Sequence, residues 1–202
     1  MNQAENIKEN THRRPKSHKA LREVYEWLDA VSISIIIIIL LFTFVFRIVG
    51  IKGESMENTH YENDRVIISN LFYKPETGDV IVISRNYLNE SGNTSESDTP
   101  IIKRVIATEG QEVSIDPKTG IVCVDGVELT ENYIKPGGIT TWLDGSSEAR
   151  SVVVEKGHIF VMGDNRGNSL DSRDASIGQV DVRYVLGHAL FRVYPVDSIG
   201  GL

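Results

Sequence analysis

LDAVSISIIIIILLFTFVF, residues 28–46, separates two kinds of structure in this chain of 202 residues. It carries one charge, Asp29, at its leading edge, and the aliphatic run that follows has no polar face. A helix of about 19 residues is roughly 28 Å long, close to the thickness of the hydrocarbon core of a bilayer. A buried core helix is the alternative, but the length and the missing polar face favour the membrane. We therefore predict one transmembrane helix over residues 28–50, behind a polar tail over residues 1–27.

The charges beside this segment predict its orientation. The basic residues ahead of it are Lys8, Arg13, Arg14, Lys16, Lys19 and Arg22, and shortly after it come only Arg47 and Lys52. The positive-inside rule puts the N-terminus in the cytoplasm and residues 51–202 on the extracytoplasmic side of the cell membrane. The apolar run is longer than the core of a cleaved secretory signal, and no small-residue cleavage site follows it. We expect a retained single-pass anchor in contact with membrane lipid.

The part of the chain beyond the anchor is acidic. Residues 48–202 carry 14 basic and 23 acidic side chains, a net charge of −9, which argues against nucleic acid as a partner. The single cysteine, Cys123, excludes an internal disulfide and alternates with valines, as a buried strand residue does. The sequence has no H-E-x-x-H motif, cysteine pair or phosphate-binding glycine loop, so we predict neither a metal nor a cofactor.

After the anchor, the apolar pattern becomes alternating, which is typical of β-strands. Short runs rich in Val and Ile predict strands at residues 65–69, 79–84, 101–107 and 185–195. An Asp-Gly pair predicts a hairpin over residues 121–129. Residues 151–154 and 159–162 are interpreted as the two strands of another hairpin.

Two stretches between these strands are predicted to be loop insertions. Residues 86–99 are polar with few apolar side chains, and residues 135–150 are rich in turn-forming residues, with Trp142 as a candidate to pin them. No long helix is indicated beyond the membrane segment. We therefore expect residues 51–202 to form a mainly β domain, an antiparallel sheet or partial barrel of Greek-key type.

Ser55 is the first candidate for chemistry. It lies in KGESMENTHYENDRVIIS, residues 52–69, a few positions beyond the anchor. This stretch is either a polar linker that leaves the membrane or the location of a nucleophile at the membrane surface. The surrounding G-E-S-M-E differs from the G-x-S-x-G turn of α/β-hydrolases, and the five histidines have no spacing that indicates a catalytic triad.

Lys103 is the second candidate, in TPIIKRVIATEG at residues 99–110. Adjacent strand side chains point to opposite faces, so Lys103 and Arg104 cannot share a side. The pattern alone favours a solvent-facing Lys103 on an edge strand. If Lys103 faces inward instead, desolvation lowers the pKa of its amine toward neutrality. A neutral amine is a competent general base for a serine.

The third candidate region is MGDNRGNSLDSRD, residues 162–174. It combines small polar residues with the charged side chains Asp164, Arg166, Asp171 and Arg173. It lacks the alternating oxygen ligands and the terminal Glu of a calcium loop, so we do not expect calcium. We expect Asp–Arg pairs that make the loop rigid beside an active site.

In this order and behind an anchor, the three regions resemble bacterial type I signal peptidases, the membrane-bound Ser/Lys endopeptidases. The resemblance is carried by Ser55-Met56 with Thr59, GDVIV at 78–82, KRVI at 103–106, GDNRGNSLDSR at 163–173 and the closing LGHALFRVYP. A lone S-M or K-R means little, whereas GDNR-x-x-S-x-D-S-R behind a K-R-V-I is highly specific. The resemblance covers most of residues 53–192 and implies the antiparallel catalytic sheet of that family.

The resemblance also implies roles for individual residues. Ser55 matches the nucleophile and Lys103 the general base, which overturns the solvent-facing interpretation of Lys103. Ser169 matches a serine whose hydroxyl orients the lysine amine. Met56, a flexible apolar side chain beside the nucleophile, is expected either to line a substrate pocket or to touch lipid.

Further residues match structural positions of the family. We expect one ion pair between Asp171 and Arg173 and a second between Asp164 and Arg104. Gly163 is expected to permit a close approach of the backbone beneath the lysine.

The sequence departs from the family pattern at three places. Asn58 and His60 replace a proline and a leucine that often follow the nucleophile, and A-T-E-G-Q at residues 107–111 replaces a G-L-P-G-D turn. Some members have a serine two residues before the nucleophile as an oxyanion donor, where this chain has Gly53. The oxyanion hole must then rest on the Ser55 backbone N–H and another donor.

The function implied by the resemblance is removal of N-terminal signal peptides from exported preproteins, with cleavage after a small residue. Two alternatives stay open: an inactive, membrane-tethered relative that serves in binding or assembly, and a peptidase dedicated to one substrate such as a pilin. A self-cleaving Ser/Lys protease of the repressor type is disfavoured by the spanning helix and by the lack of a DNA-binding half.

Overall fold

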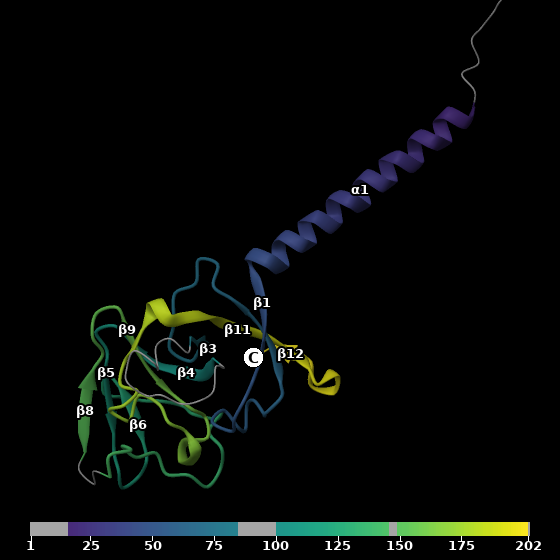
Figure 1. Cartoon of the computed structure of the whole chain (residues 1–202). Coiled ribbons are helices and arrows are strands. Elements are labelled where there is room, and N and C mark those ends of the chain that lie inside the picture. Colours follow the sequence, from purple (N-terminus) through teal and green to yellow (C-terminus); the bar gives the residue numbers. More distant parts are fainter. Residues whose placement is uncertain (1–15, 85–99, 146–148, 202) are drawn as a thin grey trace, which may run out of the picture. The chain divides into compact units, whose positions relative to one another are not determined.

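The computed structural model describes residues 16–84, 100–145 and 149–201. The chain divides into two compact units, residues 1–44 and residues 45–202. Each unit has its own secondary structure: among the described residues, the first contains a helix (Figure 1), and the second contains strands, turns and three short 3-10 helices. The 3-10 helices are η1 Arg166–Asn168, η2 Val182–Tyr184 and η3 Val196–Ser198.

The first unit is formed by helix α1, Lys16–Phe44 (Figure 1). Its segment Leu21–Thr43 has a mean hydropathy of 2.1 and is long and apolar enough to cross a membrane. None of the apolar window is buried against protein. An uncovered apolar helix satisfies its own backbone hydrogen bonds, which is the requirement for a segment surrounded by lipid.

The boundaries predicted for this region need correction. Helix α1 begins inside the predicted polar tail and ends at Phe44, whereas the prediction carried the helix to residue 50. Strand β1, Phe46–Gly50, follows it and pairs with β2, Arg65–Ser69, in antiparallel register from Phe46↔Ser69 to Gly50↔Arg65. The prediction is wrong here because the backbone of residues 46–50 obtains its hydrogen bonds from a neighbouring strand.

The main sheet contains eight strands in the order β1-β2-β11-β3-β4-β9-β10, with β12 paired to β11. The strands not yet introduced are β3 Val80–Ile83, β4 Ile101–Thr108, β9 His158–Met162, β10 Val180–Asp181, β11 Val185–Tyr194 and β12 Gly200–Gly201. Neighbouring strands are antiparallel. Strands β1 and β10 are the two edges, so the sheet stays open, as a partial barrel does. The prediction of a mainly β antiparallel fold is confirmed.

A second, smaller sheet has the order β7-β6-β5-β8. Its strands are β5 Glu112–Ile115, β6 Val122–Val124, β7 Val127–Glu128 and β8 Arg150–Val153. Strands β6 and β7 form the hairpin predicted from Asp125-Gly126, whose φ angles of 51° and 76° suit a two-residue turn. The other predicted hairpin is wrong, because β8 pairs with β5 while β9 pairs with β4 and β10.

The main sheet has a hydrophobic cluster on each face. Along β3, Ile81 and Ile83 belong to one cluster, and the alternate residues Val80 and Val82 belong to another. Side chains alternate between the faces of a strand, so a strand with four buried residues must be covered on both sides. Strand β4, the neighbour of β3, is therefore held in the interior of the domain.

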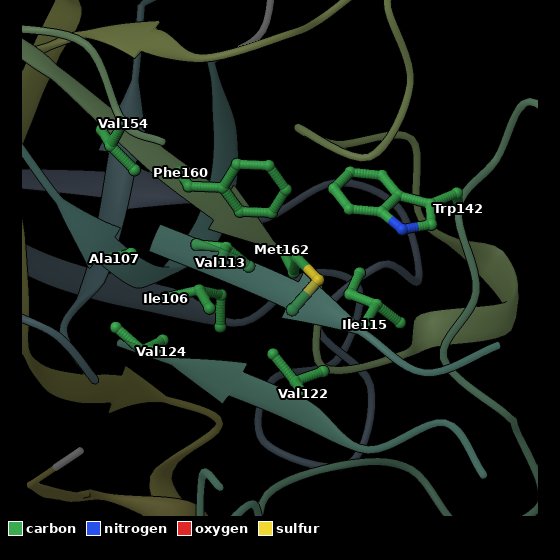
Figure 2. Packing of buried hydrophobic residues seen from close by; sticks show 10 residues of the cluster. All are labelled: Ile106, Ala107, Val113, Ile115, Val122, Val124, Trp142, Val154, Phe160 and Met162. Carbon is green, nitrogen blue, oxygen red and sulfur yellow. The ribbon is translucent and has the colours of Figure 1, made fainter. Parts of the chain in front are cut away.

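A third cluster joins the two sheets (Figure 2). It combines side chains of β4 and β9 with those of β5 and β6. Trp142 of the predicted 135–150 insertion also belongs to it and meets the Phe160 ring edge-on, at 6.0 Å between centroids and 82° between planes. Among the described residues of this insertion, only Arg150 belongs to a helix or strand. The other predicted insertion, residues 86–99, lies outside the described residues.

Candidate active site

Strand β4 carries Lys103 in the middle of the main sheet. Its neighbours are β3 and β9, so β4 is not an edge strand, and Lys103 is only 4% exposed. The solvent-facing position that the pattern alone favoured is therefore wrong. Burial lowers the pKa of the Lys103 amine from 10.5 to about 8, although the nearby negative charges of Asp171 and Asp164 act to raise it.

Ser55 lies in the turn region between β1 and β2. The N–H of Glu57 donates to the carbonyl of Glu54 at 3.1 Å, which closes a turn around the serine. The Lys103 amine donates to Ser55 Oγ, with 2.6 Å between Nζ and Oγ. The central strand and this turn therefore bring a buried amine within hydrogen-bonding distance of a serine hydroxyl. When the amine is neutral, the same separation suits transfer of the hydroxyl proton to it.

The buried carboxylate of Asp171 organises one side of the site. It accepts hydrogen bonds from Nε and Nη2 of Arg173, both at 2.8 Å, and from the Gly163 N–H at 3.0 Å. Burial acts to raise the pKa of Asp171, but the Arg173 guanidinium and the hydrogen bonds hold that pKa below its ordinary value. The side chain is therefore a carboxylate with all of its charge compensated by neighbours.

Ser169 and Gly163 lie against this carboxylate and against the nucleophile turn. The Ser169 hydroxyl donates to Asp171 at 2.7 Å, and within the described parts of the chain it has no hydrogen bond with Lys103. A Cβ at Gly163 would lie 2.3 Å from Ser169 Oγ and 2.4 Å from the Ser55 carbonyl oxygen. Gly163 thus makes room for Ser169 and for the backbone of the nucleophile, and the expected contact between Ser169 and the lysine is replaced by one with Asp171.

Arg104 fixes the opposite side of the site. Its Nε and Nη2 donate to the two carboxylate oxygens of Asp164 at 2.8 and 2.7 Å, and its Nη1 donates to the Gly78 carbonyl at 2.7 Å. The guanidinium also lies over the Tyr133 ring, 4.0 Å from its centroid. Asp164 accepts a further hydrogen bond from the Thr59 hydroxyl at 2.6 Å. Through Asp164, these hydrogen bonds connect Thr59, in the turn that follows the nucleophile, to Arg104 of strand β4.

Met56 and Gly53 flank Ser55 and differ in exposure. Met56 is 1% exposed and belongs to the same hydrophobic cluster as Ile51 and Val66. As a core side chain it presents almost no surface, so the expected pocket-lining or lipid-contacting role finds no support at this position. Gly53 is exposed and has a φ of 85°, a left-handed conformation that favours glycine.

Asn58 and His60, which depart from the family pattern, help to shape the nucleophile turn. Asn58 has a φ of 90° and donates from Nδ2 to the Tyr133 carbonyl at 3.3 Å. His60 is fully buried, and burial together with the positive charge of Arg192 lowers its pKa to about 4. The imidazole is therefore neutral at physiological pH and acts as a packing group.

Sequence reasoning missed the partners of two residues in the 162–174 region. Arg166 is 2% exposed, forms an ion pair with Glu131, and donates to Thr140 Oγ1 at 2.9 Å and to the Gly163 carbonyl at 3.0 Å. Glu131 lies in a loop far along the chain, and no motif pointed to it. Asn165 contacts the nucleophile turn directly, with its N–H 3.0 Å from the Ser55 carbonyl. The only signal in the sequence was the place of Asn165 inside the G-D-N-R stretch.

Within residues 16–84, 100–145 and 149–201, no group of three His, Cys, Asp or Glu side chains is arranged to hold a metal ion. The chemistry available at the site is that of a serine hydroxyl, an amine of lowered pKa and backbone N–H donors. These groups are suited to acyl transfer, with the serine as nucleophile and the amine as base. The fold and site thus define a candidate serine peptidase behind an apolar helix.

Comparison with known proteins identifies the family. The family model described as signal peptidase, peptidase S26, matches residues 24–194. This range includes most of the apolar helix, together with Ser55, Lys103 and the whole 162–174 region. The chain belongs to this family, and its N-terminal helix is accordingly that of a membrane-anchored peptidase.

Individual relatives cover nearly the whole chain. It is 31% identical to the probable signal peptidase I of Mycobacterium leprae, over 93% of this chain and 81% of that protein. It is 32% identical to the signal peptidase I of Leptolyngbya laminosa, over 91% and 86% of the two chains. A crystal structure of a signal peptidase I from Enterococcus faecalis aligns with a TM-score of 0.42 and 23% identity, covering 57% of this chain and 97% of that one.

Proposed function

We propose that this protein removes signal peptides from exported preproteins as a Ser/Lys endopeptidase, with Ser55 as nucleophile and Lys103 as general base. The observation that carries the proposal is the 2.6 Å separation of Lys103 Nζ and Ser55 Oγ. With the pKa of the buried amine at about 8, roughly a tenth of it is neutral at pH 7. The substrate class is supported by family membership, since relatives over most of the chain bear the name signal peptidase I.

In the acylation step, Ser55 Oγ attacks the carbonyl carbon of the scissile peptide bond while its proton passes to Lys103 Nζ. The new C–O bond forms as the carbonyl π bond opens, and negative charge develops on the carbonyl oxygen. Backbone N–H donors, that of Ser55 first, stabilise this oxyanion, a contribution of about 3–4 kcal/mol for one donor. The C–N bond then breaks, and the Lys103 proton goes to the leaving amine.

Deacylation repeats these transfers with water as nucleophile. The neutral Lys103 amine takes a proton from the water molecule, whose oxygen attacks the acyl ester on Ser55. The ester C–O bond breaks, and Ser55 Oγ recovers its proton from Lys103. The enzyme returns to its starting state with no cofactor consumed.

The charged network serves to hold these groups in position. Asp171 and Arg173 fix Gly163 and Ser169, while Arg104 and Asp164 fix the turn through Thr59. None of these side chains is needed as a proton carrier. Their role is positioning, and preorganised positions are what an acyl-transfer site requires.

The substrate binds as an extended strand added to an exposed sheet edge, with small residues one and three positions before the cut in shallow apolar pockets. The N-terminus of the enzyme is cytoplasmic and residues 51–202 are extracytoplasmic, in keeping with the basic residues ahead of α1. The apolar part of the preprotein lies in the bilayer, so its scissile bond emerges at the outer surface. In the sequence, Ser55 lies 11 residues beyond the end of α1 at Phe44, in the segment that follows the anchor.

The test is cleavage of a synthetic preprotein by the purified full chain in detergent, with the product ends read by mass spectrometry. We expect cutting after one small residue, and a loss of at least about a thousandfold in kcat/KM for Ser55→Ala and for Lys103→Ala, because the two residues act as a unit. Ser151→Ala and Lys118→Ala, at exposed positions, are the matched controls and should cleave as the wild type does.

The other outcomes separate the alternatives. Full activity of Lys103→Ala means that another group is the base. Wild-type protein that binds preproteins but cuts none of them is the inactive, tethered relative. Cutting confined to one preprotein, such as a pilin, identifies a dedicated peptidase with the same dyad.

A further inference from the structure

We propose that Asn165 is a positioning residue that orients the backbone N–H of Ser55 toward the oxyanion. It does so by a hydrogen bond to the Glu54 carbonyl, which belongs to the same peptide group as the Ser55 N–H. This proposal rests on the proposed function, in which Ser55 is the nucleophile. It assigns a specific part of oxyanion stabilisation to a side chain that touches neither the substrate nor the serine hydroxyl.

Asn165 holds the carbonyl groups on both sides of the nucleophile. Its backbone N–H donates to the Ser55 carbonyl at 3.0 Å, and its side-chain Nδ2 donates to the Glu54 carbonyl at 3.1 Å. The Glu54 carbonyl also accepts the Glu57 N–H at 3.1 Å. Asn165 is only 8% exposed, so water competes little for these hydrogen bonds.

Because the peptide group is planar, the hydrogen bond to the Glu54 carbonyl also fixes the direction of the Ser55 N–H. In a trans peptide, the carbonyl and the N–H of the same planar group point in opposite directions. The Glu54 carbonyl and the Ser55 N–H belong to one such group. Fixing the carbonyl toward Asn165 therefore directs the Ser55 N–H away from Asn165. Across the described ranges of the chain, this N–H has no hydrogen-bond partner, as a donor reserved for substrate requires.

The neighbouring glycines make this orientation important. Gly53 offers no hydroxyl to assist the oxyanion, so stabilisation depends on backbone donors. Gly163 has no Cβ, which would lie 2.4 Å from the Ser55 carbonyl oxygen, so the segment that carries Asn165 can approach the turn. A preorganised donor avoids the reorganisation that would otherwise accompany the development of charge.

Asn168 provides a matched comparison on the same segment. Its Nδ2 donates to the Glu54 carboxylate at 3.0 Å, so it contacts the side chain of Glu54 while Asn165 holds the backbone carbonyl. Asn→Asp at either position keeps the size of the side chain, removes its donor and adds one negative charge, so the added charge is common to the two variants. Only the change at residue 165 releases the peptide group that carries the Ser55 N–H.

The experiment measures kcat and KM of the full-length enzyme on a preprotein for wild type, Asn165→Asp and Asn168→Asp. Complete loss of an oxyanion donor costs about 100- to 1,000-fold in kcat. A donor that is kept but poorly oriented costs less than a donor that is removed. We therefore expect kcat to fall roughly 10- to 100-fold for Asn165→Asp. KM should change less than about threefold, because ground-state binding does not use this N–H. Asn168→Asp should stay within about threefold of wild type in both constants.

The pH profile separates positioning from general damage to the fold. The acid limb of kcat/KM, which reports Lys103, should keep its midpoint in Asn165→Ser, because this variant adds no charge near the amine and leaves the contacts of Lys103 in place. If Asn165→Asp does not fold, Asn165→Ser, which is small and neutral, carries the same prediction. Equal kcat for the Asn165 and Asn168 variants, or a loss that appears mainly in KM, overturns the proposal.

A parallel Ser55→Ala measurement distinguishes the two proposals. If Ser55→Ala is inactive while Asn165→Asp behaves like Asn168→Asp, only the positioning role of Asn165 falls. If Ser55→Ala cleaves as fast as the wild type, Ser55 is not the nucleophile and both proposals fall.

Discussion

At the scale of single residues, the lowered pKa of Lys103 affects both the stability of the domain and the proposed chemistry. The folded pKa of about 8 lies below the ordinary 10.5, so the protonated amine destabilises the fold below about pH 8. That cost disappears as the pH rises from 8 through 10.5, because the unfolded chain binds the proton more tightly in this window. The full cost is on the order of 3 kcal/mol. The same burial raises the neutral fraction of the amine beside Ser55.

Gly163→Ala should be among the most damaging single changes in the site. The new methyl group would lie 2.4 Å from the Ser55 carbonyl oxygen and 2.3 Å from Ser169 Oγ, so the nucleophile turn must move. A displacement of about 1 Å from the productive geometry costs roughly a hundredfold in rate. We therefore expect kcat to fall by at least that factor, measured by preprotein cleavage at saturating substrate.

Gly167→Ala is the control for this substitution. Gly167 is exposed, and a Cβ at that position meets no atom within 4 Å. Its activity should match that of the wild type. A Gly163→Ala enzyme with wild-type kcat would show that the close approach of residue 163 to the nucleophile turn has no part in the reaction.

The sequence indicated the proposed nucleophile and base, but it did not predict which residues surround them. Motif order pointed to Ser55 and Lys103, whereas the local pattern placed Lys103 in solvent, because a strand pattern does not say which strand is central. The Ser169 hydroxyl was expected at the lysine and lies on Asp171. The partnership of Arg166 with Glu131 had no local signal, since it depends on how a distant loop packs.

At the scale of elements, the junction between the two sheets is a single packed cluster (Figure 2). Strand β4 belongs to the main sheet, and β5 follows it in the second sheet after a short turn. Phe160 of β9 is 1% exposed and packs against Trp142 within this cluster. Strand β9 also leads directly into the segment that holds Asp164 and Asp171. Packing at Phe160 therefore supports the active-site segment as well as the sheets.

Phe160→Ala should lower the free energy of unfolding by about 3–5 kcal/mol, because it removes buried contacts and leaves a cavity. The measurement is urea unfolding of the full chain in detergent, followed by tryptophan fluorescence. Phe72→Ala is the matched control: Phe72 is 95% exposed, and its loss should change the free energy by less than about 0.5 kcal/mol. Equal effects of the two substitutions would contradict the packing of this cluster.

Elements were predicted well where the signal is local and poorly where it is not. Alternating Val and Ile runs gave most strands, and Asp125-Gly126 gave the β6–β7 hairpin. The predicted helix extended too far because Phe46, Ile48 and Val49 continue the apolar composition, and only the pairing with β2 shows that they form a strand. Strands β8 and β9 are close in sequence but belong to different sheets. A pattern of neighbouring residues cannot predict which sheet a strand joins.

At the scale of the whole molecule, an uncovered apolar helix precedes an acidic β domain. The hydropathy of Leu21–Thr43 and the family match agree on a membrane-anchored peptidase. The basic residues ahead of the helix favour a cytoplasmic N-terminus. The proposed orientation is the one in which the site faces the side where exported preproteins emerge.

Protease added outside intact spheroplasts tests the orientation. We expect it to digest residues 51–202 and to leave an N-terminal epitope tag intact until the membrane is opened with detergent. A cytoplasmic marker protein that survives in the same sample is the control. Loss of the N-terminal tag with survival of the β domain would reverse the proposed topology.

The measurement that tests the central claim most directly is the pH dependence of kcat/KM for preprotein cleavage by the full chain, from pH 6 to 11. Because Lys103 must be neutral to accept the Ser55 proton, kcat/KM should rise with pH, with a midpoint near 8. Lys118→Ala should reproduce this profile. A midpoint near 10.5, that of an ordinary lysine, or near about 6.5, that of a histidine, would contradict a buried Lys103 as the general base.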